Sequence, residues 1–255
     1  MQPILNVYSL PDVVMPEKVA GDTAVVIDVL RASTTMICAL AAGAHEVIPC
    51  REVADALVAA KSFAPDQRVL GGERGGARIE GFDLGNSPEE YTPQRVAGKT
   101  VVFTTTNGTR AILRVRSARE VLIAGFVNVS AMVQRLLDCR RIHILCAGTG
   151  GRMSEDDVLL AGLLVERLQR QARSSWRKNG QAATAQNFWR QSLASTPGSA
   201  VQPESQMLIE WLRASRGARN LLRLGLDRDI QAAAQIDRFA CVPRFDPASH
   251  CIRLA

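Results

Sequence analysis

The chain has 255 residues, of which 47% are hydrophobic and 22% are charged. This length can bury a large core, and the ordinary charged fraction excludes global disorder. The sequence has no run of about 18 uninterrupted apolar residues, so we expect no membrane span. Residues 1–7 lack the basic segment and apolar core of a signal peptide. These features predict a cytoplasmic protein.

A formal net charge of +6 invites the interpretation that the partner is a nucleic acid. However, the basic residues are scattered and aromatic residues make up only 5% of the chain, so no segment combines positive charge with base-stacking rings. We therefore expect a small anionic substrate as partner and no nucleic acid. The six cysteines show neither a CxxC pair nor a zinc-ligand spacing, so we expect reduced, structural thiols. The sequence is compatible with a homo-oligomer and does not determine the oligomeric state.

Short β-branched runs alternate with longer helical patterns through the first two-thirds of the chain. Strands are predicted over 24–29, 46–50, 100–104, 120–124 and 141–146, and helices over 33–43, 53–63, 129–137 and 154–171. This alternation predicts an α/β fold: a sheet of mixed or mostly parallel strands with flanking helices.

The composition then changes over 172–206, which is rich in Gln, Ala, Ser and Arg. We interpret its start as an extension of the preceding helix, its end at 195–199 as an exposed loop, and the whole as a variable connector. Beyond it, helices are predicted over 207–215 and 219–224, and a terminal extended piece over 240–243. Without a sharp linker, the chain is predicted to form one domain over 1–255, or two intimately packed lobes.

Four polar segments follow predicted strands, where open α/β sheets bind their ligands. In the first, Asp28 closes an apolar strand, a position that is costly unless the carboxylate is paired or metal-bound. Arg31 could bind an anion, with Ser33 and Thr34 offering hydroxyls and amides at a helix start. Alternatively, Ser33 caps the helix and Asp28 pairs with Arg31.

The second segment, 71–88, interleaves many glycines with Glu73, Glu80 and Asp83. Glycines let the backbone approach a ligand closely, and carboxylate oxygens suit Mg²⁺. The alternative is a glycine-rich surface turn with solvated charges, which would need fewer glycines and acids.

The third segment joins a strong strand to a helix and supplies hydroxyls, amides and one guanidinium for an oxyanion cradle. Its members are Thr105, Thr106, Asn107, Gly108, Thr109 and Arg110. It lacks the P-loop pattern. The helix is predicted from Thr109. An Asn-Gly turn with Thr109 as the N-cap of this helix would explain 107–109 but leave the preceding threonine run without a role.

The fourth segment runs from Cys146 through a glycine loop into a predicted helix. Ser154 is placed as the helix cap, with Asp157 at the capping-box position. First-turn acids also compensate the helix dipole, yet three in a row exceed that need, so Glu155 or Asp156 is a candidate metal ligand.

Together these segments resemble the 2-phosphosulfolactate phosphatase family, the ComB type. The matching stretches are 27–35, 72–76, 81–88, 104–111, 146–149, Glu155-Asp156, Ala161-Gly162, Asp229-Ile230, 237–239 and 242–243. The similarity spans nearly the whole chain except 172–206, and it implies a ComB-like fold.

The resemblance implies Mg²⁺-dependent hydrolysis of 2-phospho-3-sulfolactate to 3-sulfolactate and phosphate, a step of coenzyme M biosynthesis in methanogens. Such a substrate carries phosphate, sulfonate and carboxylate, so we expect Arg31, Arg74 and Arg110 to bind these groups. The candidate Mg²⁺ ligands are Glu73, Asp83, Glu155 and Asp156.

Asp28 and Arg31 are the expected catalytic residues, with Asp28 activating the attacking water. Asp28 could instead ligate the metal or form an aspartyl-phosphate. Two other functions use the same residues: a phosphatase of another phosphorylated hydroxy acid, and a non-catalytic binder of a small phosphorylated or sulfonated metabolite.

Overall fold

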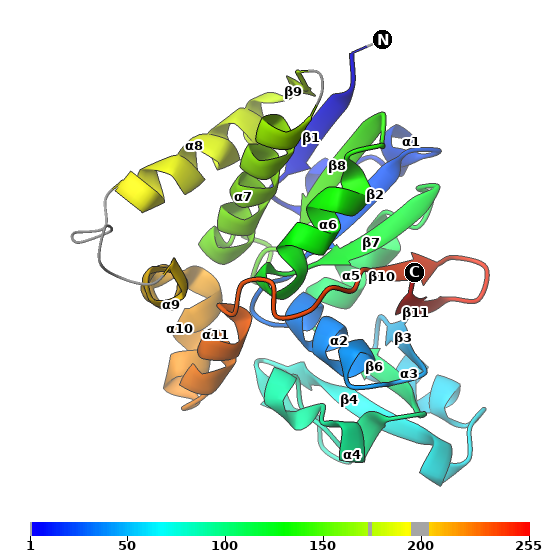
Figure 1. Ribbon diagram of the computed structural model, residues 1–255. Helices are drawn as coiled ribbons and strands as arrows, with labels where there is room; N and C mark the ends of the chain where they lie inside the picture. Colours follow the sequence, from blue (N-terminus) through cyan, green and yellow to red (C-terminus); the bar gives the residue numbers. More distant parts are fainter. Residues whose placement is uncertain (1, 173–174, 195–203) are drawn as a thin grey trace.

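A computed structural model describes residues 2–172, 175–194 and 204–255 (Figure 1). These residues form an 11-stranded sheet in the order β5-β4-β6-β3-β11-β10-β7-β2-β8-β1-β9. Most neighbouring strands are parallel, and helices flank the sheet, which confirms the predicted α/β class.

The sheet contains two parallel blocks. The smaller block is formed by β4 (Arg68–Arg74), β6 (Thr100–Thr104) and β3 (Glu46–Cys50), with the short β5 (Ala77–Arg78) antiparallel at its edge. The larger block is formed by β7 (Glu120–Ala124), β2 (Thr23–Ile27), β8 (Arg141–Cys146), β1 (Ile4–Tyr8) and β9 (Arg177–Lys178). In the larger block, Ile27 pairs with both Ala124 and Cys146, so three strands end level with one another.

A C-terminal hairpin joins the two blocks. Its strands β10 (Pro243–Asp246) and β11 (Cys251–Leu254) pair antiparallel with β7 and β3, respectively. The sequence predicts only an extended piece over 240–243, because a proline and alternating charges obscure these strands. The sheet is therefore mixed at its centre and parallel on both sides.

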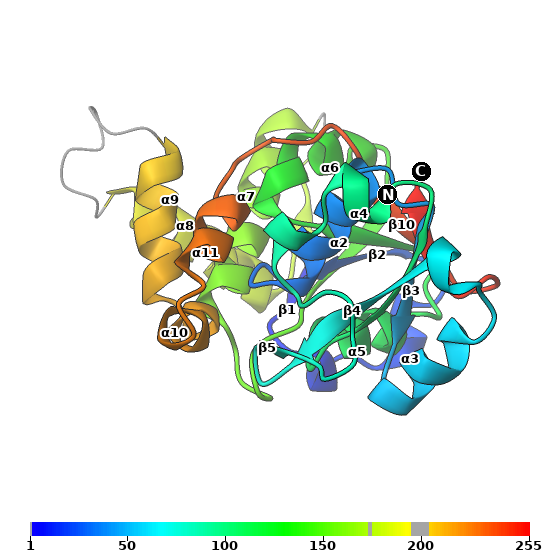
Figure 2. The same ribbon diagram turned by 90° about the horizontal axis from the view of Figure 1, so that it is seen from below.

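Helices cover both faces of the sheet (Figure 2). On one side lie α2 (Ala32–Ala41), α4 (Pro93–Val96) and α6 (Val129–Leu136); α3 (Val53–Ala60) and α5 (Gly108–Arg114) lie on the other. Strand β2 is buried along its whole length, with Val25 and Ile27 in one hydrophobic cluster and Ala24 and Val26 in another. This two-sided burial explains why its sequence is continuously apolar instead of alternating.

The segment that follows α7 (Glu155–Gln171) differs from the prediction of a connector. The helix ends at Gln171, and α8 (Gly180–Ala194) packs along it. Ala182, Ala185 and Trp189 are buried in the same hydrophobic cluster as the buried face of α7. The small residues hide this helix in the sequence because alanine carries little of the apolar signal. The loop expected over 195–199 lies outside the described residues.

Several further elements complete the fold. They are α1 (Pro16–Val19), α9 (Glu204–Ala214), α10 (Arg216–Arg223), α11 (Asp227–Ala233) and the 3₁₀ turns η1 (Pro11–Val13), η2 (Pro65–Gln67), η3 (Pro88–Glu90) and η4 (Phe126–Asn128). All six cysteines are free thiols, as expected. Within the described part of the chain, no helix has the length and apolar character needed to cross a membrane.

Candidate active site

The four polar segments meet at the carboxyl edge of the sheet. A Cβ built on Gly108 would lie 2.7 Å from Oδ2 of Asp28, so the threonine loop runs directly against the end of β2. The Thr106 amide donates to Glu73, which links this loop to the glycine-rich segment. The Gly150 amide reaches Asn107 at 3.4 Å, which brings in the loop after β8. The sequence pattern therefore located one shared site.

Asp28 is a buried carboxyl at the centre of this site, only 7% exposed. Its Oδ1 accepts a hydrogen bond from the Ala32 amide at 3.2 Å. Burial raises the pKa of Asp28 to about 7, and the negative charges of Asp156 and Glu73 act in the same direction. A carboxyl with this pKa can both hold and release a proton near neutral pH.

Two further buried acids stand beside Asp28 at the start of α7. The Asp157 carboxylate accepts hydrogen bonds from the amides of Val29 and Gly148, both at 2.9 Å. It thereby connects the loop after β2 to the loop after β8. Burial raises the pKa of Asp157 well above its ordinary range, and Asp156 and Asp28 raise it further. Burial likewise raises the pKa of Asp156. The three acids crowd negative charge into one place.

The first turn of α7 is built differently from the predicted capping box. Ser154 occupies the N-cap position but makes no side-chain cap bond. The Ser154 hydroxyl donates a hydrogen bond to Asp156, while the Asp157 carboxylate accepts hydrogen bonds from the Val29 and Gly148 amides outside the helix. The acid that the sequence explains as a helix cap is thus a bridge between two loops.

The Arg31 side chain is hydrogen-bonded to other residues of the protein. It is 4% exposed, and its guanidinium donates to Asp229 of α11 and to the Gly76 carbonyl, each at 2.7 Å. Asp229 also accepts a hydrogen bond from the Ser87 hydroxyl. The expected alternative, an Asp28–Arg31 pair, is therefore wrong, because Asp229 takes that place. Arg31 clamps the end of β2 to the glycine-rich segment and to α11.

The hydroxyls of Ser33 and Thr34 are also used within the loop. Ser33 accepts the Asp28 amide at 2.9 Å, and Thr34 donates to the Val29 carbonyl at 2.8 Å. Both residues are fully buried in α2. These bonds fix the backbone that carries Asp28.

The threonine loop contains hydroxyls that are hydrogen-bonded within the loop and one that is not. Thr105 and Thr109 bond one another: the Thr109 hydroxyl donates to the Thr105 carbonyl at 3.0 Å, and each amide reaches the other hydroxyl at 3.3 Å. The helix begins at Gly108 with Asn107 at the N-cap, one residue before the expected Thr109 start. In contrast, the buried Thr106 hydroxyl has no hydrogen-bond partner among the described residues. It is the hydroxyl of this loop that can accept or donate to a ligand.

Glu73 supports the loop from the other side. Its two carboxylate oxygens accept the Thr106 and Gly76 amides, both at 2.7 Å. Close packing of β4 on β6 makes this possible, because a Cβ on Gly72 would lie 2.0 Å from the Thr104 carbonyl oxygen. Only glycine fits at that position.

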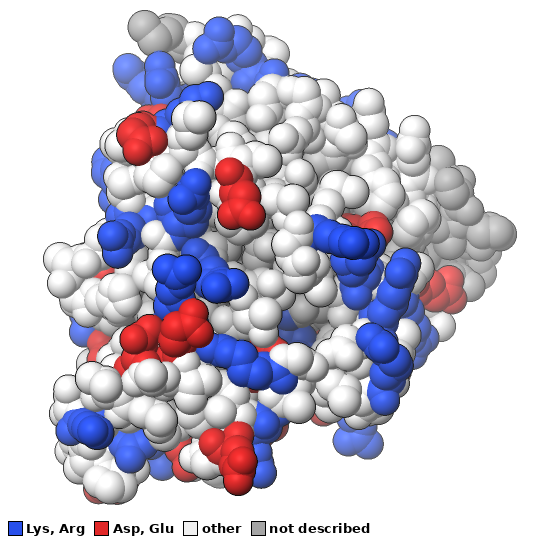
Figure 3. Space-filling model, turned by 180° about the vertical axis from the view of Figure 1, so that it is seen from behind, with Lys and Arg blue, Asp and Glu red and all other residues white. Residues whose placement is uncertain are grey.

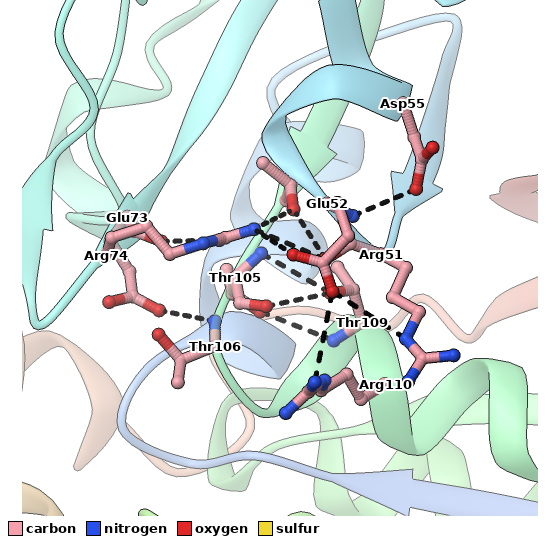
Figure 4. Close-up of polar contacts among 10 residues, drawn as sticks. Arg51, Glu52, Asp55, Glu73, Arg74, Thr105, Thr106, Thr109 and Arg110 are labelled. Atoms are coloured by element: carbon pink, nitrogen blue, oxygen red, sulfur yellow. Dashed lines mark hydrogen bonds and ion pairs between the residues drawn. The ribbon is translucent and has the colours of Figure 1, made fainter.

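A group of arginines surrounds Glu52 at the rim (Figure 4). Nε of Arg51 and Nη2 of Arg110 lie 3.7 and 3.8 Å from Oε1 of Glu52, and Nη2 of Arg74 lies 3.9 Å from Oε2. Arg74 also donates to the carbonyls of Glu73 and Arg51 and to the Thr104 hydroxyl, which orients it. Arg110 is exposed and free of such ties to the backbone in the described residues. The two predicted anion binders, Arg74 and Arg110, thus stand together.

Most of the chain matches known proteins. The family model described as 2-phosphosulpholactate phosphatase matches residues 8–247. The chain belongs to the 2-phosphosulfolactate phosphatase family. This confirms the resemblance read from the sequence and makes the protein an enzyme of the phosphoric monoester hydrolase class.

Relatives in this family cover almost the same length. A probable 2-phosphosulfolactate phosphatase of Synechococcus sp. (strain RCC307) is 41% identical over 95% of this chain and 96% of its own. Those of Deinococcus radiodurans and Caldanaerobacter subterraneus subsp. tengcongensis are 40% and 39% identical, over 95% and 86% of this chain and 93% and 86% of theirs.

The four predicted metal ligands of this phosphatase-family chain are not brought together. Asp83 is exposed and accepts the Leu70 amide at 2.8 Å, within β4 and away from its end. Glu155 accepts the Arg216 amide at 2.7 Å and faces α10. Glu73 and Asp156 remain beside Asp28, where both raise its pKa. Among the described residues, no group of three His, Cys, Asp or Glu side chains is arranged to hold a metal ion.

Sequence reasoning missed four polar residues that build this phosphatase-family site. Asp157 was hidden by its fit to a capping box, and Asp229 lies 198 residues from Arg31 in the chain. Arg51 and Glu52 follow β3, so their place after a predicted strand could have revealed them. Asp229 had one signal as well, since it falls in a stretch that matches the family.

Proposed function

We propose that this protein hydrolyses 2-phospho-3-sulfolactate to 3-sulfolactate and phosphate. The observation that carries the proposal is the position of Asp28, a buried carboxyl with a pKa of about 7 lying against the Gly108 backbone of the threonine loop. A base of this kind beside a set of oxyanion donors suits attack of water on a phosphoryl group. The family to which the chain belongs supports the substrate.

The anionic groups of the substrate would be held from two sides. The free hydroxyl of Thr106 lies on the sheet side of the site, and the guanidinium groups of Arg74 and Arg110 lie at its rim. Arginine is suited to these groups because its planar fork contacts two oxygens at once. Arg31 acts indirectly, because its bonds to Asp229 and Gly76 hold the backbone on which Asp28 stands.

Asp28 would act on the water. Its Oδ1 accepts a hydrogen bond from the Ala32 amide, which leaves Oδ2, the oxygen that faces Gly108, to accept the proton of the attacking water. In the metal-free protein, the negative charges of Asp156 and Glu73 raise the proton affinity of Asp28. The Asp28 carboxyl then loses the proton again as the leaving alcohol forms.

Mg²⁺ is part of the proposal, and the site suits an ion held by two carboxylates together with substrate oxygens. Asp156 and Glu73 are carboxylates whose charges both act on Asp28, and no Lys or Arg of the described chain forms an ion pair with Asp28 or Asp156. Mg²⁺ is commonly held by one or two carboxylates together with substrate phosphate oxygens. Asp156 and Glu73 would hold the ion, which when bound would supply positive charge to the phosphoryl oxygens. Asp83 and Glu155 point elsewhere and are left out of this set.

The test is an assay of phosphate release by the purified protein. Racemic 2-phospho-3-sulfolactate and a panel of other phosphorylated hydroxy acids are each incubated with Mg²⁺ or with EDTA. We expect release that is fastest from 2-phospho-3-sulfolactate and is abolished by EDTA. Faster release from another acid would replace the proposed substrate, and release unchanged by EDTA would overturn the metal. Absence of release from every compound, with the protein folded by circular dichroism, would contradict the function.

The cellular setting is also proposed. The product 3-sulfolactate is the compound that the resemblance places in coenzyme M biosynthesis, and we expect the enzyme to act in the cytoplasm. Growth of a deletion strain with and without added 3-sulfolactate would test this, and a defect that 3-sulfolactate does not relieve would argue against it.

A further inference from the structure

A cleft of about 760 Å³ opens beside the site, between α5 and the turn η1. Thr106 and Asn107 of the threonine loop form part of its wall, so the cleft continues from the place where the phosphoryl group would bind. From there it extends along α5 past Leu113 to Ser117, beyond the end of the helix. A three-carbon acid would occupy only the end nearest Thr106, since pockets of this size enclose much larger ligands.

The wall of the cleft is strongly basic. Four arginines line it, Arg51, Arg110, Arg114 and Arg116, against the single acid Asp12. Figure 3 views the side of the molecule opposite α2 and α6, and Lys and Arg side chains gather across the middle of this face. Glu52 lies 3.7 and 3.8 Å from Arg51 and Arg110 near one end, and Arg114 and Arg116 lie farther along the chain.

Two of these arginines are repeated on one face of a helix. Arg110 and Arg114 are four residues apart in α5, so both side chains stand above the same groove. Like charges at this spacing destabilise a helix, so the pair is not explained by helix stability. Nε of Arg114 donates to the Val14 carbonyl at 3.0 Å, which holds the guanidinium at the wall.

The cleft also has apolar lining residues. Leu10, Pro11, Pro16 and Leu113 line the same cleft as the arginines and the threonine loop. A phosphate, a sulfonate and a carboxylate on three carbons offer almost no apolar surface to such side chains. Methylene groups do, because their transfer from water to an apolar surface is favourable. The lining therefore suits an anion at each end of a carbon chain.

We propose that this cleft binds the distal anionic group of phosphate monoesters longer than a three-carbon acid, and that the enzyme hydrolyses them. This inference rests on the proposed function. The reaction is unchanged: the water oxygen bonds to phosphorus, the bond from phosphorus to the ester oxygen breaks, and the alcohol keeps one of the two water protons. The distal group is a phosphate, a sulfonate or a carboxylate, which share the charge and oxygen atoms that arginine recognises.

The test compares three synthetic substrates: 1,6-hexanediol bisphosphate, 1,3-propanediol bisphosphate and hexyl phosphate, which lacks the distal anion. We expect kcat/KM for the six-carbon bisphosphate to exceed that for hexyl phosphate about tenfold, mainly through KM. The substitution Arg116→Gln is expected to reduce this ratio about three- to tenfold, as one lost charged contact would. Arg119→Gln is the matched control, because Arg119 lines a separate cleft with Gln2 and Arg141.

Two results would overturn the inference. One is an equal kcat/KM for the six-carbon bisphosphate and hexyl phosphate; the other is a ratio that Arg116→Gln leaves unchanged or that Arg119→Gln lowers as much. In either case, hydrolysis of 2-phospho-3-sulfolactate would still support the proposed function. If no compound is hydrolysed, the proposed hydrolysis is overturned, and calorimetric binding of the same two six-carbon compounds tests the cleft alone: tighter binding of the bisphosphate that Arg116→Gln weakens supports it, and equal binding contradicts it.

Discussion

The acids of the site and the acid between α7 and α8 are buried to a similar degree but have opposite electrostatic settings. Asp28 is 7% exposed and Glu166 is 4% exposed. Glu166 forms ion pairs with Arg190 at 2.8 Å and with Arg170 at 2.7 Å, and it accepts a hydrogen bond from the Gln186 side chain. These contacts lower the pKa of Glu166 although burial raises it. Burial raises the pKa of Asp28 to about 7, and the charges of Asp156 and Glu73 add to this rise, while the Ala32 amide opposes it.

This contrast shows that the site charge is a local property and not a consequence of composition. The chain is rich in arginine, and elsewhere it pairs buried acids with that residue: Glu166 is one case and Asp229, with Arg31, is another. At the carboxyl edge, Asp28, Asp156 and Asp157 lack such a pair among the described residues. An unpaired buried charge is unfavourable for folding, so we interpret the arrangement as one that serves a ligand or a proton.

The largest expected effect is the loss of turnover in Asp28→Asn. The amide cannot accept a proton, so the rate of phosphate release should fall by about a hundredfold or more. Asp66→Asn is the matched control, since Asp66 is exposed in η2. Release measured under saturating substrate checks this, and a rate within threefold of the wild type would contradict the role given to Asp28.

Asp229→Asn should lower the free energy of unfolding by about 3 kcal/mol, because it leaves the Arg31 guanidinium buried without its counter-charge. Asp227→Asn, on the same helix, breaks an exposed pair with Arg213 and should have a much smaller effect. Urea unfolding of both variants compares them directly. Equal losses would show that the Arg31–Asp229 pair contributes no more than a surface pair.

The stability difference between Asp28→Asn and the wild type should depend on pH in a direction set by the raised pKa of Asp28. The folded protein binds a proton at Asp28 up to a pKa of about 7, whereas the unfolded chain releases it near 3.8, so this contribution to stability is complete below 3.8 and lost as pH rises through 7. The variant has no such loss. Without added metal, its melting temperature should exceed that of the wild type at pH 8, with the gap closing towards pH 4. A gap that is constant with pH would contradict the raised pKa.

Glu166→Gln should show the opposite and smallest pH dependence. Its lowered pKa means that Glu166 stabilises the fold above the ordinary range of a glutamate and loses this contribution as pH falls through the lowered folded value. At pH 7 the variant should be about 1 kcal/mol less stable, since both arginines are largely exposed. Thermal unfolding at pH 7 and pH 3 measures the stability of the variant relative to the wild type. A larger loss of stability at pH 3 than at pH 7 would contradict the lowered pKa of Glu166.

Most of the strands could be predicted because each is a continuous buried run bounded by turn residues. The strands 46–50, 100–104, 120–124 and 141–146 have the predicted bounds. The hairpin β10–β11 could not be predicted, because its strands form by pairing with strands that are far away in the sequence. Helix α8 was missed because it packs through alanines, whose small side chains weaken the helical pattern.

The location of the site was predictable, but the partner of each side chain was not. Placing polar segments at strand ends brought Asp28, Glu73 and Thr106 together, as the hydrogen bond from the Thr106 amide to Glu73 shows. The sequence did not reveal that Arg31 is held by Asp229, because that contact spans 198 residues and comes from a different helix. Nor did it separate Asp83 from the acids of the site, since spacing alone does not tell whether a carboxylate faces solvent.

The most direct test is an NMR titration of the carboxyl carbon of Asp28 in the metal-free protein, with the resonance assigned by its loss in Asp28→Asn. We expect a pKa near 7 that falls in Asp156→Asn, because the charge of Asp156 contributes to the shift. A pKa within the ordinary range of an aspartate, or one unmoved by Asp156→Asn, would contradict the buried, crowded carboxyl on which the proposed reaction depends.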